Sequence, residues 1–360
     1  MELIKAFRNP EAADNLSNEI HQLVGQKAVK IMEVCGGQTH TIYKYRLKDL
    51  LPPGLKLVSG PGCPVCVTPV SYIDKAVRLA LDRDVSIFTF GDLIRVPGSE
   101  LSLEQAAAEG GDIQTVYSAL QAVEAARRQP DRQTVFLGIG FETTVPSLAL
   151  SILKAEELGL DNFSMLLSAK QVPPVLDALL MSEKVEINGF ITPGHVTAVI
   201  GTRAYDAVCE RHRVPMACGG FEPLDILMAV RDLCRLVLEK RHDNINAYTR
   251  VAGRDGNIKA QQVIEQVFEP ADEELRGIGV IPGAGYAFNS VYRDYDAERK
   301  FDVKVEGREA KGCICGEILA GVKEPVDCPL FRKQCTPGSP VGACMVSSEG
   351  CCSAAYLYDG

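Results

Sequence analysis

Cysteine, glycine and histidine stand together in one short stretch, EVCGGQTH, at residues 33–40. The stretch follows an apolar run and contains Cys35, two glycines and His40. A thiolate is a soft metal ligand, and an imidazole can bind a metal or carry a proton, so this combination points to metal or redox chemistry. For each residue alone a structural role is more common, because a lone Cys or His is usually a packed core group.

A second motif, GPGCPVC at residues 60–66, contains the C-x-x-C pair Cys63 and Cys66. This spacing lets two sulfurs approach each other as a redox disulfide or as two arms of a metal site, and a helix beginning there would lower the pKa of the first thiol. One pair cannot complete a zinc site. Cys35 and His40 are the obvious further ligands.

The strongest signal is the segment from Lys311 onward, which is rich in Cys, Gly and Pro and has little periodicity. Seven of the thirteen cysteines fall within it, at Cys313, Cys315, Cys328, Cys335, Cys344, Cys351 and Cys352. Four thiolates binding an iron–sulfur cluster or zinc would hold together a segment that cannot bury much apolar surface. The spacing alone does not separate these two metals or select the four ligands.

Composition narrows the class of protein. The chain has 360 residues, is 46% hydrophobic and carries a formal net charge of −9. Phosphate binding needs clustered Lys and Arg, and none are clustered here, so we expect no nucleic-acid partner. No signal peptide and no run of 18 apolar residues is present, which predicts a cytoplasmic protein with reduced thiols and no membrane contact.

Short β-rich runs ending on glycine alternate with amphipathic helical patterns from about Val29 to His242. This alternation predicts an α/β fold with two similar Rossmann-like parallel-sheet domains, followed by a Cys-rich, largely irregular C-terminal iron–sulfur region. We expect an N-terminal helical segment at 1–28, α/β domain 1 at 29–120, α/β domain 2 at 121–242 and the C-terminal region at 243–360.

Several polar side chains follow the predicted strands. Ligands of open parallel sheets bind beyond the carboxyl ends of the strands, so these groups could converge on one cleft if the two domains face each other. The cleft would then hold the motif residues together with three acidic residues and one histidine from further along the chain: Asp92, Glu142, His195 and Glu222.

Taken together, EVCGGQTH, GPGCPVCVTP, FGDLIRVPGS, GFETT, PGH, GFEPLD and the ending CPLF…C…MVSSEGCC resemble the HypD family of NiFe-hydrogenase maturation proteins. The resemblance extends from about residue 30 to the C-terminus. So many unusual motifs in one order make it highly specific.

The resemblance implies a cytoplasmic scaffold on which the Fe(CN)2CO group of the hydrogenase is assembled. It implies a HypC-like small chaperone that shares an iron ion with this chain, and a HypE-like protein that delivers cyanide from a thiocyanate. Cys35, His40, Cys63 and Cys66 match the family's motif positions. Alone, the chain is expected to be a monomer, because its working surface would serve other proteins.

The resemblance also implies a 4Fe-4S cluster in the tail. Its ligands best match Cys313, Cys328, Cys335 and Cys352. Cys315 is the alternative for the first position and Cys351 for the last, whereas Cys344 looks dispensable.

These residues suggest a chemical hypothesis. Cys35 would ligate iron, the paired glycines would let backbone N–H groups approach cyanide, and His40 would supply a proton or hydrogen bond. Oxidation of the Cys63/Cys66 dithiol would supply the two electrons that release cyanide from a thiocyanate. Glu142, His195 and Glu222 would complete the cleft.

Two other classes of protein remain open. An iron–sulfur-dependent thiol–disulfide oxidoreductase would use Cys63 and Cys66 without needing Cys35 and His40. A zinc-stapled scaffold would use the tail cysteines and have no redox role. The sequence leaves open the source of carbon monoxide, the order of ligand addition and the client hydrogenase.

Overall fold

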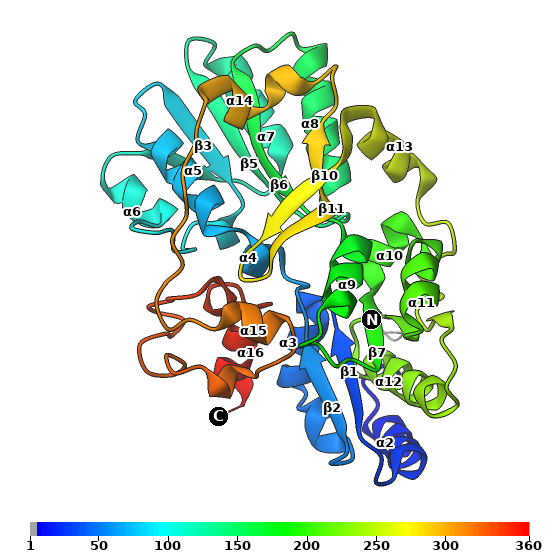
Figure 1. The fold of residues 1–360 in the computed structure, drawn as a ribbon. Coiled ribbons are helices and arrows are strands. Elements are labelled where there is room, and N and C mark those ends of the chain that lie inside the picture. Colours follow the sequence, from blue (N-terminus) through cyan, green and yellow to red (C-terminus); the bar gives the residue numbers. More distant parts are fainter. Residues whose placement is uncertain (1–5, 360) are drawn as a thin grey trace.

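The computed structural model describes residues 6–359 and shows two parallel β-sheets with helices, followed by a cysteine-rich C-terminal region of mostly irregular structure (Figure 1). The predicted fold class is therefore confirmed. Residues 1–5 of the predicted N-terminal helical segment lie outside the described residues. The rest of that segment contains helix α2, Pro10–Val24, which begins after the capping side chain of Asn9.

Lobe 1 is built on a five-stranded sheet in the order β2-β1-β7-β8-β9. All of its pairs are parallel, with Ile31 opposite Leu57 on one side and Gly189 on the other. Its strands are β1 Val29–Glu33, β2 Leu55–Ser59, β7 Gly189–Pro193, β8 Met216–Gly219 and β9 Asn244–Asn246. Its further helices are α3 Gly36–Lys44, α10 Gly194–Ile200, α11 Asp206–His212 and α12 Pro223–Leu238, with short 3-10 helices η1 Leu47–Leu50 and η3 Thr202–Tyr205.

Helix α12 illustrates how helices pack on the lobe 1 sheet. It begins with Pro223, whose ring favours a first helical position, and its apolar residues recur with helical spacing. Ile226, Val230 and Leu233 are buried in one core cluster with residues of α2 and of the sheet. Burial of this face, rather than helix propensity alone, stabilises the helix.

Lobe 2 is built on a four-stranded parallel sheet in the order β4-β3-β5-β6. Strand β5 is an almost continuous apolar run that is buried on both faces, as expected for the centre of a parallel sheet. The strands are β3 Val85–Thr89, β4 Asp112–Thr115, β5 Gln133–Gly140 and β6 Phe163–Ala169. The helices are α5 Val70–Ala80, α6 Leu103–Ala108, α7 Ala119–Arg128 and α8 Val145–Glu157, with η2 at Gly91–Leu93. Helix α9, Val172–Met181, follows β6 and packs on β11, Gly279–Phe288, and on α11 of lobe 1 (Figure 1).

An antiparallel hairpin follows lobe 1 in the chain and packs on lobe 2. The buried Lys170 ammonium, just after β6, pairs with the Glu273 carboxylate of the hairpin at 2.7 Å, which ties the two together. The elements of this part are α13 Ile258–Val267, β10 Phe268–Leu275, β11 Gly279–Phe288, η4 Arg293–Tyr295 and α14 Ala297–Phe301.

The strands are grouped differently from the division predicted at residue 120. β1 and β2 pair with β7 to β9, whereas β3 and β4 pair with β5 and β6. The chain leaves the first sheet after β2, builds the whole second sheet and returns at β7 to pair with β1. Strand periodicity reveals that a strand exists but not which strand it will pair with, so the crossing is a tertiary feature.

The tail, residues 311–359, lies beside both lobes, below lobe 2 and next to α3 in Figure 1. Its helix α16, Cys351–Tyr358, packs on α3, and η6, Ala343–Met345, packs on the short helix α4, Pro64–Val67. The other elements are α15 Cys315–Leu319 and η5 Pro325–Asp327. The tail thereby meets both sequence motifs that carry the remaining candidate cysteines.

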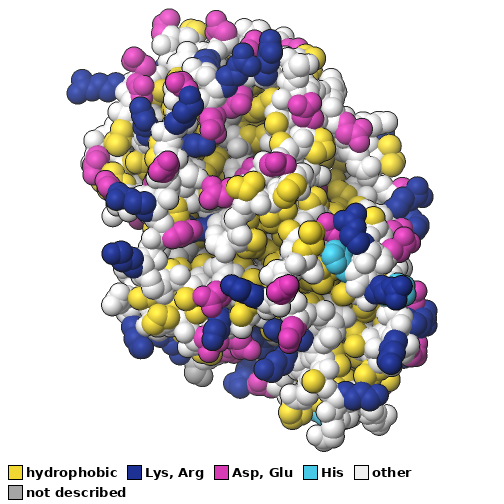
Figure 2. All heavy atoms as spheres, viewed as in Figure 1, with side chains coloured by type: hydrophobic (Ala, Val, Ile, Leu, Met, Phe, Trp, Pro, Cys, Tyr) yellow, Lys and Arg dark blue, Asp and Glu magenta, His cyan; other side chains and the backbone are white. Residues whose placement is uncertain are grey.

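No helix within residues 6–359 combines the length and apolar character needed to cross a membrane. Figure 2 shows basic and acidic side chains interspersed over the face that it displays, without a large region of one sign.

Candidate metal and redox site

Cys35 lies between the end of β1 and the first residue of α3, at the carboxyl edge of the lobe 1 sheet. Its side chain is partly exposed. Burial raises the pKa of the Cys35 thiol to about 12, and the Glu349 carboxylate adds to the rise, whereas backbone N–H groups of Gly37 and Gln38 oppose it. The group is therefore a protonated thiol at neutral pH, and a bound metal cation would stabilise its thiolate.

A buried carboxyl group, Glu33, supports the turn formed by residues 35–37, here called the CGG turn. It accepts hydrogen bonds from the Cys35 backbone N–H at 3.0 Å and from the Thr39 hydroxyl. Burial raises the pKa of Glu33 to about 7. Glu33 is not among the predicted site residues, although a carboxylate at the end of the apolar run VKIMEV was a signal that could have identified it.

The two glycines of the turn are needed for close packing. A Cβ on Gly36 would lie 2.5 Å from Cβ and 2.9 Å from the carbonyl oxygen of Glu349 in the tail. A Cβ on Gly37 would lie 3.0 Å from the Phe221 ring. The structure thus accounts for both glycines through the tail and Phe221, without a bound ligand.

A Gly36→Ala substitution is expected to displace residues 347–349 from the CGG turn. Alanine favours a helix more than glycine does, but the backbone clash with Glu349 outweighs this gain, and we expect a loss of about 1–3 kcal/mol in unfolding free energy. Chemical denaturation measures the loss, and limited proteolysis reports the loosened tail. Gly253→Ala is the matched control, because nothing lies within 4 Å of its added Cβ. Equal stability of the two variants would contradict the packing argument.

His40 lies on α3 and is directed to the tail by its contacts. Its ring Nδ1 is 3.3 Å from the Ser348 carbonyl oxygen, and its ring packs edge-on against Tyr358 with centroids 5.4 Å apart. No hydrogen bond joins His40 to Cys35 among the described residues. Cys35 therefore precedes the helix that carries His40, and His40 contacts the tail segment beside the turn.

The C-P-V-C loop packs directly on the CGG turn. A Cβ on Gly62 would lie 2.2 Å from the Cys35 backbone nitrogen, so only glycine allows this approach. Cys63 caps α4, and its sulfur accepts a hydrogen bond from the Cys66 backbone N–H at 3.3 Å. Both thiols of the pair are buried. The structure thus brings the two motifs together, as the convergence argument predicts.

Cys66 connects this pair to the tail. Burial raises the pKa of the Cys66 thiol, but hydrogen bonds from the Cys344 and Cys63 thiols outweigh it, so the net shift is downward. Cys344 also lies 2.6 Å, sulfur to sulfur, from Cys315. The sequence analysis set Cys344 aside as dispensable, but the structure places it between the C-P-V-C pair and the other tail cysteines.

A tight cavity of only about 10 Å³ in the tail is lined mainly by thiols and apolar side chains. All four predicted cluster ligands line it, as do Cys315 and Cys344, whereas Cys351 does not. Its lining residues are Cys313, Cys315, Ile318, Cys328, Leu330, Phe331, Cys335, Gly342, Cys344, Met345 and Cys352.

The donor set of this cavity fits a thiolate-ligated group. No carboxylate, imidazole or amide side chain lines it, and a Cβ on Gly342 would lie 2.7 Å from the Cys313 sulfur, so the glycine keeps that space open. Within residues 6–359 no three His, Cys, Asp or Glu side chains are already arranged around a single metal position. The fit therefore rests on the chemistry of the cavity lining.

Glu142 lies in the turn after β5 and is buried. Its Oε1 accepts a hydrogen bond from the Val172 backbone N–H at 2.8 Å, while Oε2 has no partner within the described part of the chain. Burial raises the pKa of the Tyr205 phenol in lobe 1, and the charge of Glu142 raises it further.

A Glu142→Gln variant is expected to be more stable than the wild type above pH 7. Burial raises the pKa of Glu142 from its ordinary value of 4.5 to about 7. The folded chain then holds a proton that the unfolded chain releases, so wild-type stability falls by about 1.4 kcal/mol per pH unit between these two values. Glutamine removes this loss, so the variant should gain about 3 kcal/mol at pH 8 and little at pH 4. Chemical denaturation at pH 4 and pH 8 measures the unfolding free energies of the two proteins. A difference that is the same at both pH values would contradict the raised pKa of Glu142.

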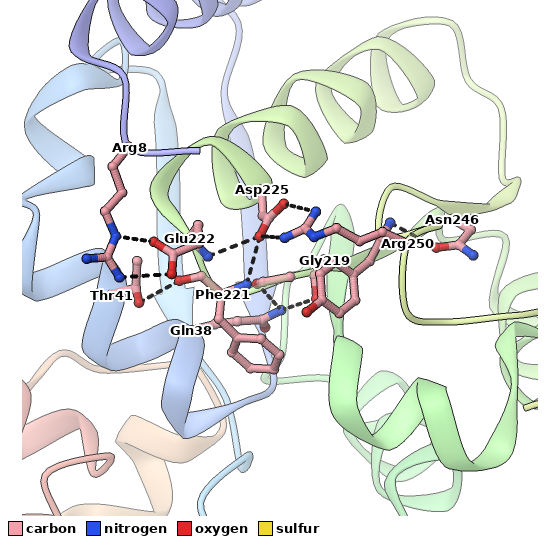
Figure 3. A network of polar contacts seen from close by, with 11 residues as sticks. Arg8, Gln38, Thr41, Gly219, Phe221, Glu222, Asp225, Asn246 and Arg250 are labelled. Atoms are coloured by element: carbon pink, nitrogen blue, oxygen red, sulfur yellow. Dashed lines mark hydrogen bonds and ion pairs between the residues drawn. The ribbon is translucent and has the colours of Figure 1, made fainter. Parts of the chain in front are cut away.

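The structure places the other predicted cleft residues in different surroundings. His195 lies at the start of α10 in lobe 1 and stacks on Phe221, which in turn contacts Gly37 of the CGG turn. Glu222 is occupied by the Arg8 guanidinium at the surface (Figure 3). Asp92 accepts a hydrogen bond from the Ser347 hydroxyl of the tail at 3.2 Å. Only His195 of these three reaches the turn through a packed side chain.

Comparison with known proteins matches residues 11–359 to the family model described as HypD, hydrogenase formation hypA family. The chain is 45% identical over 372 residues to the hydrogenase maturation factor HypD of Rhodobacter capsulatus, covering 100% of this chain and 99% of that protein. It is 43% identical over 369 residues to HypD of Cupriavidus necator, covering 99% and 97%. A hydrogenase expression/formation protein of Methanocaldococcus jannaschii is 43% identical over 331 residues, covering 92% of each chain.

Proposed function

The chain belongs to the HypD family of hydrogenase maturation factors, and from this premise we propose that it is the scaffold on which the Fe(CN)2CO group is assembled. The observation that carries the proposal is the contact between the two motifs, where Gly62 packs on the Cys35 backbone. A metal-binding thiol and a redox dithiol thereby share one sheet edge.

Iron is the cargo of this site, and Cys35 is its proposed ligand, with Cys63 and Cys66 as further ligands. A soft thiolate suits low-spin iron. The Cys35 thiol, whose pKa is raised to about 12, gives up its proton when a cation compensates the charge, so iron binding should release a proton. Glu33, which accepts the Cys35 N–H, would hold the turn in place.

The dithiol supplies the electrons for cyanide transfer in this proposal. The thiocyanate S–CN bond accepts two electrons and one proton, giving a thiol on the donor and cyanide that binds iron. Cys63 and Cys66 lose two electrons and two protons and form a disulfide, so one proton is released overall. His40 is the proposed proton or hydrogen-bond donor beside the turn.

The tail cavity would hold a 4Fe-4S cluster through Cys313, Cys328, Cys335 and Cys352. Cys315 is the alternative for the first of these, and Cys351 for the last. Such a cluster supplies single electrons that can return a disulfide to its dithiol. The contact of Cys66 with Cys344, which lines the same cavity, supports a redox connection between the pair and the tail.

The proposed partners are a HypC-like chaperone that shares the iron and a HypE-like cyanide donor. In this reading the chain is a redox-active assembly scaffold rather than a stand-alone enzyme, works in the cytoplasm and is a monomer when alone. The alternative is an iron–sulfur-dependent thiol–disulfide oxidoreductase, which the Cys63 and Cys66 geometry also permits.

An infrared spectrum tests the proposal. The protein is purified without oxygen from cells that also make its small partner, and its spectrum is recorded where metal-bound CN and CO absorb. Bands in that window are the expected result. A blank spectrum from a folded, iron-replete complex would overturn the scaffold and favour the oxidoreductase. Metal analysis of the same sample separates iron with sulfide from zinc in the tail.

A further inference from the structure

We propose that Arg250, Asp225 and Phe221 form a positioning device that holds His195 beside the CGG turn. This inference rests on the proposed function, because it adds positioning residues to the site where iron would be loaded. It is carried by a network of polar contacts around residues 219–222, which reaches the turn through Phe221 (Figure 3).

The Phe221 ring is close to both His195 and the turn. The centroids of the His195 and Phe221 rings are 4.0 Å apart with planes tilted by 30°. The Cδ1 atom at the edge of the Phe221 ring would be 3.0 Å from a Cβ on Gly37. The position of the imidazole relative to the turn therefore depends on where this one aromatic ring is held.

The backbone of Phe221 is held at both of its polar groups. Its N–H donates to Asp225 Oδ2 at 3.2 Å, and its carbonyl oxygen accepts from the Thr41 hydroxyl at 2.8 Å. Thr41 lies on α3, the helix that Cys35 precedes, so the same helix that presents the thiol also fixes Phe221.

A second residue of α3 makes a similar connection. The Gln38 amide nitrogen donates to the carbonyl oxygens of Gly219 at 3.0 Å and Gly220 at 3.3 Å. The Gln38 side chain is fully buried, which removes competition from water. Two side chains of α3, Gln38 and Thr41, thus fix the position of residues 219–221.

Arg250 completes the device from outside. Its guanidinium binds both oxygens of the fully buried Asp225 carboxylate, at 2.7 and 2.6 Å. It also lies over the rings of Tyr248 and Phe7, 4.4 and 4.0 Å from their centroids. A forked donor stacked between aromatic rings fixes the carboxylate in direction as well as charge, which lysine cannot reproduce.

The held imidazole is suited to a site that handles protons and small anions. Burial lowers the pKa of His195 below its ordinary value, so the ring is neutral at neutral pH and carries one donor and one acceptor nitrogen. No hydrogen bond to the His195 ring occurs within the described residues. The residue is exposed, so the ring nitrogens are open to a bound group.

The test uses the nuclear magnetic resonance signals of the histidine rings in the full chain, which has five histidines. A His195→Gln variant assigns the His195 signal. Phe221→Leu removes the ring current of the neighbouring aromatic group, and Arg250→Met should move the same signal although Arg250 does not contact His195. In the complex with the small partner, both variants should load CN and CO onto iron about tenfold more slowly, because small misplacements of reacting groups are costly.

Matched controls separate positioning from general destabilisation. Arg254→Met removes another arginine of the same loop, whose guanidinium pairs with Asp206 at 2.6 Å, and should leave the His195 signal and the loading rate unchanged. Phe221→Tyr keeps the aromatic ring, so the His195 signal and the loading rate should stay close to those of the wild type. Arg250→Lys serves if the methionine variant does not fold, and is expected to move the signal too.

Two results would overturn the inference. One is a His195 signal that stays in place in both Phe221→Leu and Arg250→Lys. The other is a moved signal with an unchanged loading rate. A failure of the proposed function looks different, because the wild-type complex would then carry no CN or CO bands while the His195 signal would still report the packing of Phe221.

Discussion

Replacement of Cys35 by alanine should remove all iron-bound CN and CO bands from the complex with the small partner. The sulfur is the proposed iron ligand, and neither the backbone of the CGG turn nor the protonated form of Glu33 can replace a thiolate. Hydrogenase maturation in cells should fall to the level of a strain without the protein. The side chain is small and partly exposed, so the fold should survive.

The same variant separates the two candidate functions. A thiol–disulfide oxidoreductase would retain exchange activity in Cys35→Ala, because the Cys63/Cys66 pair is intact. Cys234→Ala is the matched control, since this thiol is buried in the α12 core and burial alone raises its pKa to about 12. CN and CO bands of wild-type intensity in Cys35→Ala would show that residues other than Cys35 ligate the iron.

A Cys66→Ser variant should bind iron but transfer no cyanide to it. Serine keeps a hydroxyl in place of the thiol, yet it cannot form the disulfide that releases two electrons. The sulfur also contacts Cys344, so the variant interrupts the connection to the cysteine cavity. We expect cyanide transfer to drop to background, while iron held through Cys35 and Cys63 remains detectable.

Differential alkylation followed by mass spectrometry checks this expectation. In a single turnover of the wild type without added reductant, peptides containing Cys63 and Cys66 should lose two free thiols as one cyanide is delivered, and in Cys66→Ser they should lose none. Cys209→Ser is the control, because its buried sulfur lies 2.8 Å from the His242 carbonyl oxygen and a hydroxyl can keep that contact. Cyanide transfer by Cys66→Ser at the wild-type rate would exclude the dithiol as the electron source.

Local pattern was sufficient to predict the type of fold. Strand alternation with helices depends on side-chain periodicity within short windows, and the structure confirms parallel sheets in two lobes. The convergence of Cys35 with Cys63 and Cys66 was also predictable, because both motifs follow strands, β1 and β2, that are adjacent in sequence and in the sheet.

Partners distant in sequence could not be predicted in this way. Cys344 meets Cys66 because η6 packs on α4, and Glu349 meets Gly36 because the tail folds back over α3. Glu222 follows a strand just as His195 does, yet Arg8 takes its carboxylate at the surface while His195 packs on Phe221. No local pattern distinguishes these two outcomes.

The amino-acid sequence by itself therefore determined the chemistry available to this protein, namely the thiols, the imidazoles and the glycine turns that present them. It also determined the elements that carry these groups, because propensity and periodicity act over a few residues. Only the tertiary structure decided that β7 returns to pair with β1, that Glu33 is buried against Cys35, and that Cys344 links the dithiol to the cysteine cavity. These contacts join residues far apart in the chain or depend on burial, and burial is a property of the whole packed molecule.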